Sequence, residues 1–212
     1  PRFIHMLMAS YVTTCFVVAG ISAWYLLKGR HLALAKKGFS FTLGAALVVT
    51  TLQIFVGDTV GREIHENQPL KTAAMEGVWT TAKGVPFVIF AIPDARLEKN
   101  LYEISIPYLA SLINTHEANG ELIGLKSVER GDRPVVSSVF FAFRIMLGFG
   151  VTLFLISLVA LYLRIKGRLY DQPWFLRLCL LVSPLGFVCS LAGWITAESG
   201  RQPWVVYQLM RT

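Results

Sequence analysis

The sequence predicts an all-α integral membrane protein with four transmembrane helices and one long outer loop that contains short helices. Hydrophobic residues make up 54% of the 212 residues and charged residues 16%, against about 25% charged residues in a typical soluble domain. The mean hydropathy is +0.55. Four apolar runs are long enough to cross a bilayer, which takes about 20 helical residues. These runs cover residues 3–27, 38–56, 135–163 and 175–197.

The charges of the loops predict the orientation of the chain. Two short loops are basic, and short basic loops stay on the cytoplasmic side. Their cations are Lys28, Arg30, Lys36 and Lys37 in the first and Arg164, Lys166, Arg168 and Arg177 in the second. The connection at residues 57–134 holds 8 Lys and Arg against 11 Asp and Glu, a net charge of −3, so we expect it on the outer side. The overall charge of +7 is then mostly a topology signal, and we expect no nucleic-acid partner.

The 78-residue outer loop is too long for a simple connection, because loops of this length are usually functional or carry structure of their own. It divides the chain into residues 1–56 with two membrane helices, the loop at 57–134, and residues 135–212 with two more helices and the sequence GRQPW. One loop helix is predicted in "NQPLKTAAMEGVW", where Asn67 can cap and Pro69 suits the first turn. Another is predicted in "IPYLASLINTH".

Three ionisable side chains occupy positions where the bilayer makes charge expensive. They are His5, Arg144 and Glu198. The predicted topology places all three in the outer half of the membrane, so one site could use them together. Simpler interpretations stay open. A lone membrane histidine is more often a hydrogen-bonded core residue, and Arg144 can extend outward to the interface.

The sulfur-containing side chains are ambiguous on spacing alone. Methionine usually fills gaps in a core, which is the simpler interpretation of Met146. Gly148 and Gly150 could instead open space on the same helix, or serve close helix packing. The cysteines are Cys15, Cys179 and Cys189. They lie within apolar runs, and we interpret them as packing residues.

The end of the last apolar run carries a carboxylate where the helix dipole disfavours it. Glu198 is followed by Gly200, which suits the position after a helix, and by Arg201, which suits the helix C-terminus. A simple Glu–Arg pair is one interpretation. The spacing also places Ser190, Trp194, Glu198 and Arg201 on one helix face, which we expect to point inward.

Four stretches, taken together, resemble a known family. They are "PRFIHMLMASYVTT", "GDTVGREIHENQPLKTAAMEGVW", "FFAFRIM" and "GWITAESGRQPW". In this order and these surroundings they resemble subunit I of the cytochrome bd type quinol oxidases, over essentially the whole chain. The resemblance implies the central to C-terminal part of that subunit, without its first four helices and with a short form of its Q loop. Such a fragment is expected to be inactive alone.

The resemblance implies roles for individual residues. His5 and Met146 would be the axial ligands of a low-spin b haem, with Arg144 nearby. Glu198 would ligate a haem of the oxygen-reducing pair, which consists of a high-spin b haem and a haem d or b. Its neighbours would be Trp194 and Arg201.

The resemblance further places Lys71 and Glu76 at positions implicated in quinol oxidation. A carboxylate and an ammonium suit this reaction, because oxidation of quinol releases protons and the head group must be held. Their spacing of five residues puts them about 140° apart on a helix. Without the resemblance, a solvated amphipathic helix on the membrane surface is the simpler interpretation of this segment.

The implied function is that of a respiratory terminal oxidase, which oxidises quinol at the outer face and reduces oxygen to water. The implied partners are subunit II, possibly a small accessory subunit, ubiquinol or menaquinol, oxygen and membrane lipid. The implied location is the bacterial cytoplasmic (inner) membrane, crossed several times. Two other classes stay open: an electron-transfer cytochrome b subunit, although only one histidine lies in an apolar run, and a transporter, although the charges gather at one face.

Overall fold

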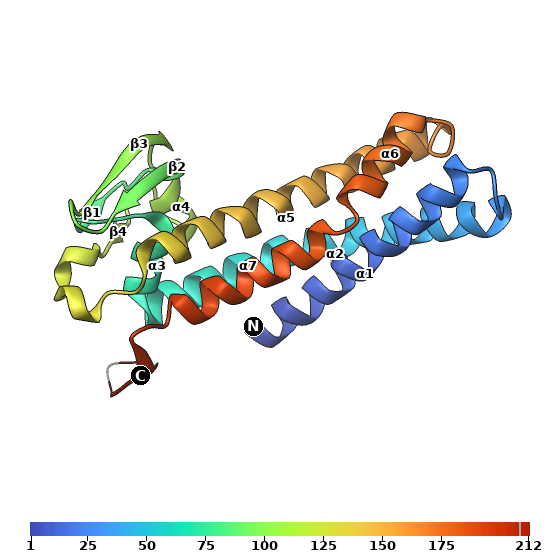
Figure 1. The fold of residues 1–212 in the computed structure, drawn as a ribbon. Helices are drawn as coiled ribbons and strands as arrows, with labels where there is room; N and C mark the ends of the chain where they lie inside the picture. The colour runs from blue at the N-terminus through green and yellow to red at the C-terminus, as the bar shows by residue number, and fades with distance from the viewer. Residues whose placement is uncertain (208) are drawn as a thin grey trace. The chain divides into compact units, whose positions relative to one another are not determined.

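The computed structural model describes residues 1–207 and 209–212. The chain forms two compact units. The first unit comprises residues 1–57 and 146–191, and the second comprises residues 58–145 and 192–212. Figure 1 labels the helices and strands of both units. Three helices contribute residues to both units: α2 (Leu32–Asn67), α5 (Val136–Ile165) and α7 (Leu185–Ser199).

The four predicted membrane helices are confirmed. Helices long and apolar enough to cross a membrane cover Arg2–Leu27, Leu32–Asn67, Arg130–Ile165 and Pro173–Ser199. The second continues eleven residues beyond the predicted end at residue 56, so the outer connection is shorter than its charge pattern predicts. The last consists of α6 (Pro173–Val182) and α7, and the break falls at Pro184, which has no backbone N–H to donate.

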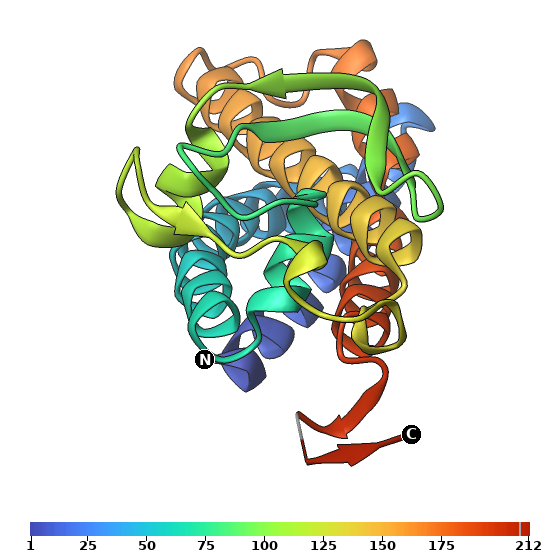
Figure 2. The same cartoon turned by 90° about the vertical axis from the view of Figure 1, so that its left-hand side faces the viewer.

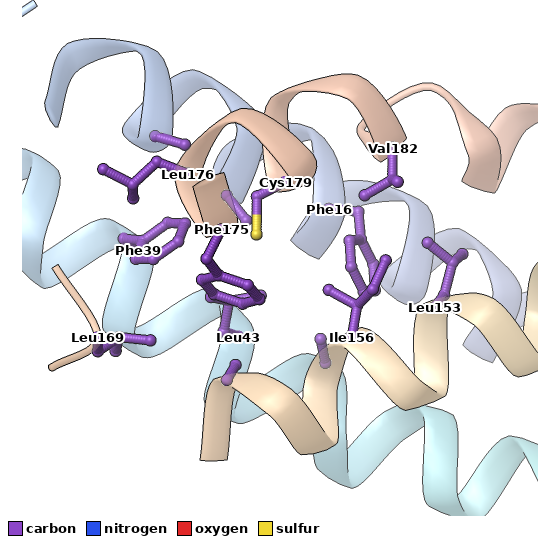
Figure 3. Packing of buried hydrophobic residues seen from close by; sticks show 14 of the residues in the cluster. Phe16, Phe39, Leu43, Leu153, Ile156, Leu169, Phe175, Leu176, Cys179 and Val182 are labelled. Atoms are coloured by element: carbon purple, nitrogen blue, oxygen red, sulfur yellow. The ribbon is translucent and has the colours of Figure 1, made fainter. Parts of the chain in front are cut away.

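The first unit is a helical bundle around an apolar core. It consists of α1 (Arg2–Leu27), α6 and the parts of α2, α5 and α7 that belong to it. Figure 3 shows Phe16, Phe39 and Phe175 in this core, all completely buried. The rings of Phe39 and Phe175 meet edge to face with centroids 6.1 Å apart. Cys179 is buried among them, and all three cysteines are free thiols, in keeping with their predicted packing role.

Helix α1 packs closely on the broken membrane helix because glycines remove the side chains at the contacts. A Cβ atom on Gly20 would lie 2.5 Å from Ser183 Cβ. One on Gly186 would lie 2.7 Å from the Thr13 Cα atom. Both distances are shorter than van der Waals contact, so these two positions require glycine.

The second unit holds the outer loop and the C-terminal end of the chain. Its helices are α3 (Pro69–Glu76) and α4 (Leu109–Thr115), followed by the 3-10 turns η1 (Leu125–Ser127) and η2 (Arg130–Asp132). Both predicted loop helices are thus confirmed. Pro69 opens α3 as predicted, but the predicted Asn67 cap is wrong. Asn67 ends α2 and donates to the Glu63 carbonyl at 2.9 Å, and Gln68 takes the N-cap position without a side-chain bond.

The second unit also contains short strands that the sequence analysis did not predict. They are β1 (Ala82–Lys83), β2 (Phe87–Asp94), β3 (Lys99–Ile106), β4 (Glu121–Leu122), β5 (Trp204–Val206) and β6 (Met210–Arg211). The pairs β1–β4, β2–β3 and β5–β6 are antiparallel. Figure 2 shows the β2–β3 hairpin most clearly. Asp94 closes it, because its Oδ1 accepts hydrogen bonds from the backbone N–H groups of Arg96 and Leu97.

Candidate functional site

Helix α3 forms the centre of the second unit. Every residue from Leu70 to Glu76 is buried, so the alternative of a solvated helix on the membrane surface is wrong. The apolar side chains of Ala73 and Ala74 join a core that includes Trp79, Leu125 and Val139. The helix ends at Gly77, whose φ of +72° is the left-handed conformation that glycine adopts without strain. A buried helix of eight residues therefore holds both Lys71 and Glu76.

Glu76 is a buried carboxylate with two partners from distant parts of the loop and from α5. Its exposed fraction is 1%. Oε1 accepts a hydrogen bond of 3.2 Å from Asn114 Nδ2, on α4. Oε2 lies 3.6 Å from Arg144 Nη2, on α5. Burial raises the pKa of Glu76 above its ordinary value, and the charge of Arg144 and the bond from Asn114 offset this rise in part.

Arg144 is fixed inside the second unit by backbone carbonyls and aromatic rings. Its Nε and Nη2 donate to the Val88 carbonyl at 2.9 and 2.6 Å, and its Nη1 donates to the Met75 carbonyl. The guanidinium also lies over the Phe140 ring, 3.7 Å from its centroid. Only 11% of the side chain is exposed. The alternative in which Arg144 extends outward to the interface is therefore wrong.

Lys71 turns to a different partner, as the five-residue spacing from Glu76 predicts. It is 5% exposed, and its Nζ donates to the Ala197 carbonyl at 3.2 Å. That carbonyl belongs to the last turn of α7, where carbonyls have no partner within the helix. A Cβ atom on Gly200 would lie 2.8 Å from Lys71 Cγ. Gly200 has no left-handed φ. Glycine is required there because the Thr196 carbonyl oxygen would lie 2.6 Å from a Cβ atom and the Lys71 stem packs on the same position.

Glu198 and Arg201 form the simple pair that was one interpretation of the sequence. Glu198 Oε2 and Arg201 Nη2 are 2.5 Å apart, and the side chains are 46% and 44% exposed. Trp194, one turn earlier, is 65% exposed. The expected inward face is thus exposed in the described part of the second unit. These three side chains are free to meet a further group.

His5 belongs to the first unit and contacts α2. Its Nε2 lies 3.2 Å from Gln53 Nε2, and its carbonyl accepts a bond of 3.1 Å from the same amide. Its Nδ1 is buried without a hydrogen-bond partner among the described residues. A Cβ atom on Gly57 would lie 3.4 Å from His5 Cε1. A half-buried imidazole whose Nδ1 is buried and unpartnered among the described residues fits the role of a metal ligand.

Met146 also belongs to the first unit, on α5. It is half-buried, and its carbonyl accepts a hydrogen bond from Cys189 Sγ at 3.6 Å. A Cβ atom on Gly148 or Gly150 would meet nothing within 4 Å. Within the described residues these glycines therefore leave open space on the helix surface and do not serve close packing. Gly150, one turn after Met146, leaves room for a ligand on the same side of the helix.

The predicted site residues are distributed over both units. His5 and Met146 fall in the first unit, whereas Arg144 and Glu198 fall in the second. Arg144 joins Glu76, which the sequence analysis had assigned to another function. No three His, Cys, Asp or Glu side chains among residues 1–207 and 209–212 gather as a metal-ion site.

Sequence reasoning missed Asn114 and Gln53. Asn114 occupies the predicted second loop helix, and its side chain is buried against Glu76. Gln53 is the one amide side chain in the apolar run at residues 38–56. A polar residue inside a membrane run is a recognisable signal, because the bilayer offers it no partner. Asn114 gave no such signal, because asparagine is common in loops.

The whole chain is similar to one family of membrane proteins. The family model for cytochrome bd terminal oxidase subunit I matches residues 1–212. The chain is 29% identical over 279 residues to cytochrome bd-II ubiquinol oxidase subunit 1 of Escherichia coli, covering 100% of this chain and 54% of that protein. It is 34% identical over 222 residues to cytochrome bd ubiquinol oxidase subunit 1 of Bacillus subtilis, covering 100% of this chain and 47% of that one.

A solved structure gives the same result. A chain of the bd oxidase from Geobacillus thermodenitrificans matches 98% of this chain with a TM-score of 0.89 and 30% sequence identity. The match covers 48% of that chain. The chain described above thus spans about half the length of the relatives that it matches.

Proposed function

We propose that this chain, which belongs to the cytochrome bd terminal oxidase subunit I family, supplies the quinol-oxidising region of a respiratory terminal oxidase. The whole enzyme would oxidise quinol at the outer face of the bacterial inner membrane and reduce oxygen to water. The observation that carries the assignment of the site is the buried cluster of Glu76, Asn114 and Arg144. It provides a proton acceptor of raised basicity inside the outer loop.

Glu76 accepts the first of the two protons that quinol releases. Asn114 holds Oε1, whereas Oε2 has no hydrogen-bond partner among the described residues and faces Arg144 across 3.6 Å. Burial raises the pKa of this carboxyl, which makes it a stronger base than an ordinary glutamate. Arg144 keeps the carboxylate ionised before it takes the proton. Because Glu76 is 1% exposed, the loop around α3 must open before a quinol hydroxyl reaches Oε2.

Lys71 contributes to quinol oxidation by holding α3 in place. Its ammonium bonds the end of α7, and its stem packs against Gly200. The helix that carries Glu76 is thereby tied to the helix that carries Glu198. We expect substitution of Lys71 to displace Glu76 and to lower the rate of quinol oxidation.

The same family membership implies haem, and the residues on this chain fit it. His5 and Met146 would hold a low-spin b haem, a ligand pair that raises the reduction potential. Glu198, with Trp194 and Arg201, would hold a haem of the oxygen-reducing pair. When bound, these groups supply the one-electron chemistry that quinol oxidation and oxygen reduction require. The chain contributes the half-buried imidazole of His5 and the open helix surface next to Met146.

The proposed assembly contains a second subunit and possibly a small accessory subunit, and residues 57–134 lie on the outer side. The substrate is ubiquinol or menaquinol. The net charge of −3 in that region supports the outer placement, because the basic loops at the other ends of the helices stay inside.

The test of this function is Glu76→Gln in the complete oxidase complex. We expect loss of quinol oxidase activity by about a hundredfold or more, since the positioned base is removed. Oxygen consumption with an artificial donor that bypasses the quinol site should be retained. Glu121→Gln, an exposed carboxylate of the same loop, is the matched control and should change neither rate.

Two results would contradict the proposal. Unchanged quinol oxidase activity in Glu76→Gln would show that Glu76 is not the proton acceptor, whereas equal loss of both activities would indicate misfolding of the variant. A reduced-minus-oxidised difference spectrum of the complete complex without haem bands would remove the oxidase assignment itself.

A further inference from the structure

The first unit contains a second polar feature, which quinol oxidation does not use. A cavity of about 700 Å³ lies between α2, α5 and the segment that follows α5. Its polar lining comes from Lys36, Lys37, Ser40, Arg164 and Tyr170. Lys36, Lys37 and Arg164 are among the cations that the charge pattern places on the cytoplasmic side, and the structure places them near the ends of α2 and α5.

Two of the cations in this cavity are exposed but have partners in its walls. Arg164 Nη2 donates to the carbonyl of Ser40 and, at 2.9 Å, to Ser40 Oγ. A Cβ atom on Gly44 would lie 3.2 Å from Arg164 Nη1, so the glycine leaves room for the guanidinium. Lys36 Nζ lies 5.5 Å from the centroid of the Tyr170 ring. The cavity thus presents the N–H donors of Arg164 and Lys36 to a ligand.

The positive charge of the cavity has no acidic partner in its walls. None of the described lining residues is Asp or Glu, and Arg164 makes no ion pair within the part of the chain that the structure describes. Three cations close to one another repel, and an anion between them would relieve this repulsion. The cavity therefore favours an anionic ligand.

The cavity wall formed by Phe41, Ala45 and Val48 is apolar, which favours a lipid over a free anion. Phe41, Ala45 and Val48 follow Lys37 at helical spacing along one face of α2. At 1.5 Å per residue, this face runs about 16 Å from Lys37 to Val48. Phe41 is 77% exposed and Val48 59% exposed. A charged end followed by an apolar strip matches a phospholipid head group followed by an acyl chain.

We propose that this cavity binds an anionic phospholipid of the cytoplasmic leaflet. Arg164 and Lys36 contact the phosphate, Lys37 adds positive charge, and an acyl chain lies along Phe41, Ala45 and Val48. The planar guanidinium suits the phosphate oxygens because its N–H groups bond them in pairs. Basic pockets between membrane helices on the cytoplasmic side bind such head groups.

The proposal is tested on the complete oxidase complex after delipidation. Native mass spectrometry measures the binding of phosphatidylglycerol, with phosphatidylcholine as the neutral lipid. We expect clear preference for phosphatidylglycerol. The double variant Lys36→Gln with Arg164→Gln should weaken its binding by about tenfold or more, because charge-assisted hydrogen bonds are lost. Arg168→Gln, an exposed cation of the same loop outside the cavity, is the control and should bind as the unaltered protein does.

A second variant addresses the apolar strip. Val48→Ser should weaken the binding of phosphatidylglycerol and leave the binding of glycerophosphate, which has no acyl chain, unchanged. Haem difference spectra and quinol oxidase activity check that each variant is folded.

Three outcomes would overturn the lipid assignment. Equal binding of both lipids would show that the cations do not select charge. Unchanged phosphatidylglycerol binding in the folded double variant would place its site elsewhere. Displacement of phosphatidylglycerol by an equal concentration of inorganic phosphate would identify a free-anion site.

Discussion

Glutamate and arginine meet at two places in the second unit, under opposite conditions. Glu76 and Arg144 lie 68 residues apart in the chain, their charged atoms are 3.6 Å apart, and their side chains are 2% and 11% exposed. Glu198 and Arg201 are three residues apart, their charged atoms are 2.5 Å apart, and their side chains are 46% and 44% exposed. The shorter contact is the one that water surrounds.

The comparison shows that exposure, more than distance, decides what an ion pair does. Water weakens the attraction between exposed charges, so the pair of Glu198 and Arg201 contributes little, and its carboxylate remains available to another ligand. Burial makes the removal of one partner of Glu76 and Arg144 costly, since the other charge is left without compensation. The buried pair thus stabilises the structure around α3, and the charge of Arg144 offsets in part the rise in the pKa of Glu76 that burial causes.

The largest change in stability is expected when Arg144, the cation of the buried pair, is replaced. Arg144→Gln should lower the free energy of unfolding of the second unit by about 3–5 kcal/mol, because the Glu76 carboxylate is left buried without a counter-charge. The guanidinium bonds to the Val88 and Met75 carbonyls are lost as well. Thermal unfolding of the complete complex measures the change.

A double variant sharpens this prediction. Glu76→Gln combined with Arg144→Gln should be more stable than Arg144→Gln alone, because no unpaired charge remains. If the loss of stability in the double variant equals the sum of the losses in the two single variants, the two side chains do not interact across 3.6 Å.

An intermediate effect, on the pH dependence of quinol oxidation, is expected when Asn114, the neutral partner of Glu76, is replaced. The hydrogen bond from Asn114 favours the ionised carboxylate, so Asn114→Leu should raise the pKa of Glu76 further. A proton acceptor must be ionised to act, and the acidic limb of the pH profile for quinol oxidation should therefore move to higher pH. The rate at a pH below that limb should fall, while the plateau above it is retained.

The control for this shift is Asn119→Leu, an exposed asparagine of the same loop. It should leave the acidic limb where it is. A uniform loss of rate at every pH in Asn114→Leu, without movement of the limb, would assign Asn114 a packing role only.

Particular residues show where sequence reasoning succeeded and where it could not. The four membrane helices follow from run length, and α3 follows from Pro69 with the helix-forming stretch after it, because these signals are local. The strands were missed although β2 reads "FVIFAIPD", since an apolar run of this length fits a strand or a buried helix equally well. The sequence around Arg144 or Asn114 does not indicate a contact with Glu76. Glu76 lies 68 residues from Arg144 and 38 residues from Asn114 in the chain, so the contacts form only when these segments pack together.

The smallest effect is expected at the exposed pair. Arg201→Gln should change the free energy of unfolding by about 1 kcal/mol or less, because the Glu198–Arg201 contact is screened and holds two long side chains in one arrangement. Thermal unfolding of the complete complex, at low and at high salt, measures this change, and the small difference should shrink further as salt is added. A loss as large as that of Arg144→Gln would contradict the comparison. It would mean that another part of the assembly covers Glu198 and Arg201 and excludes water from them. In that case the haem spectrum should change together with stability, because Glu198 would have lost its orientation as well as its partner.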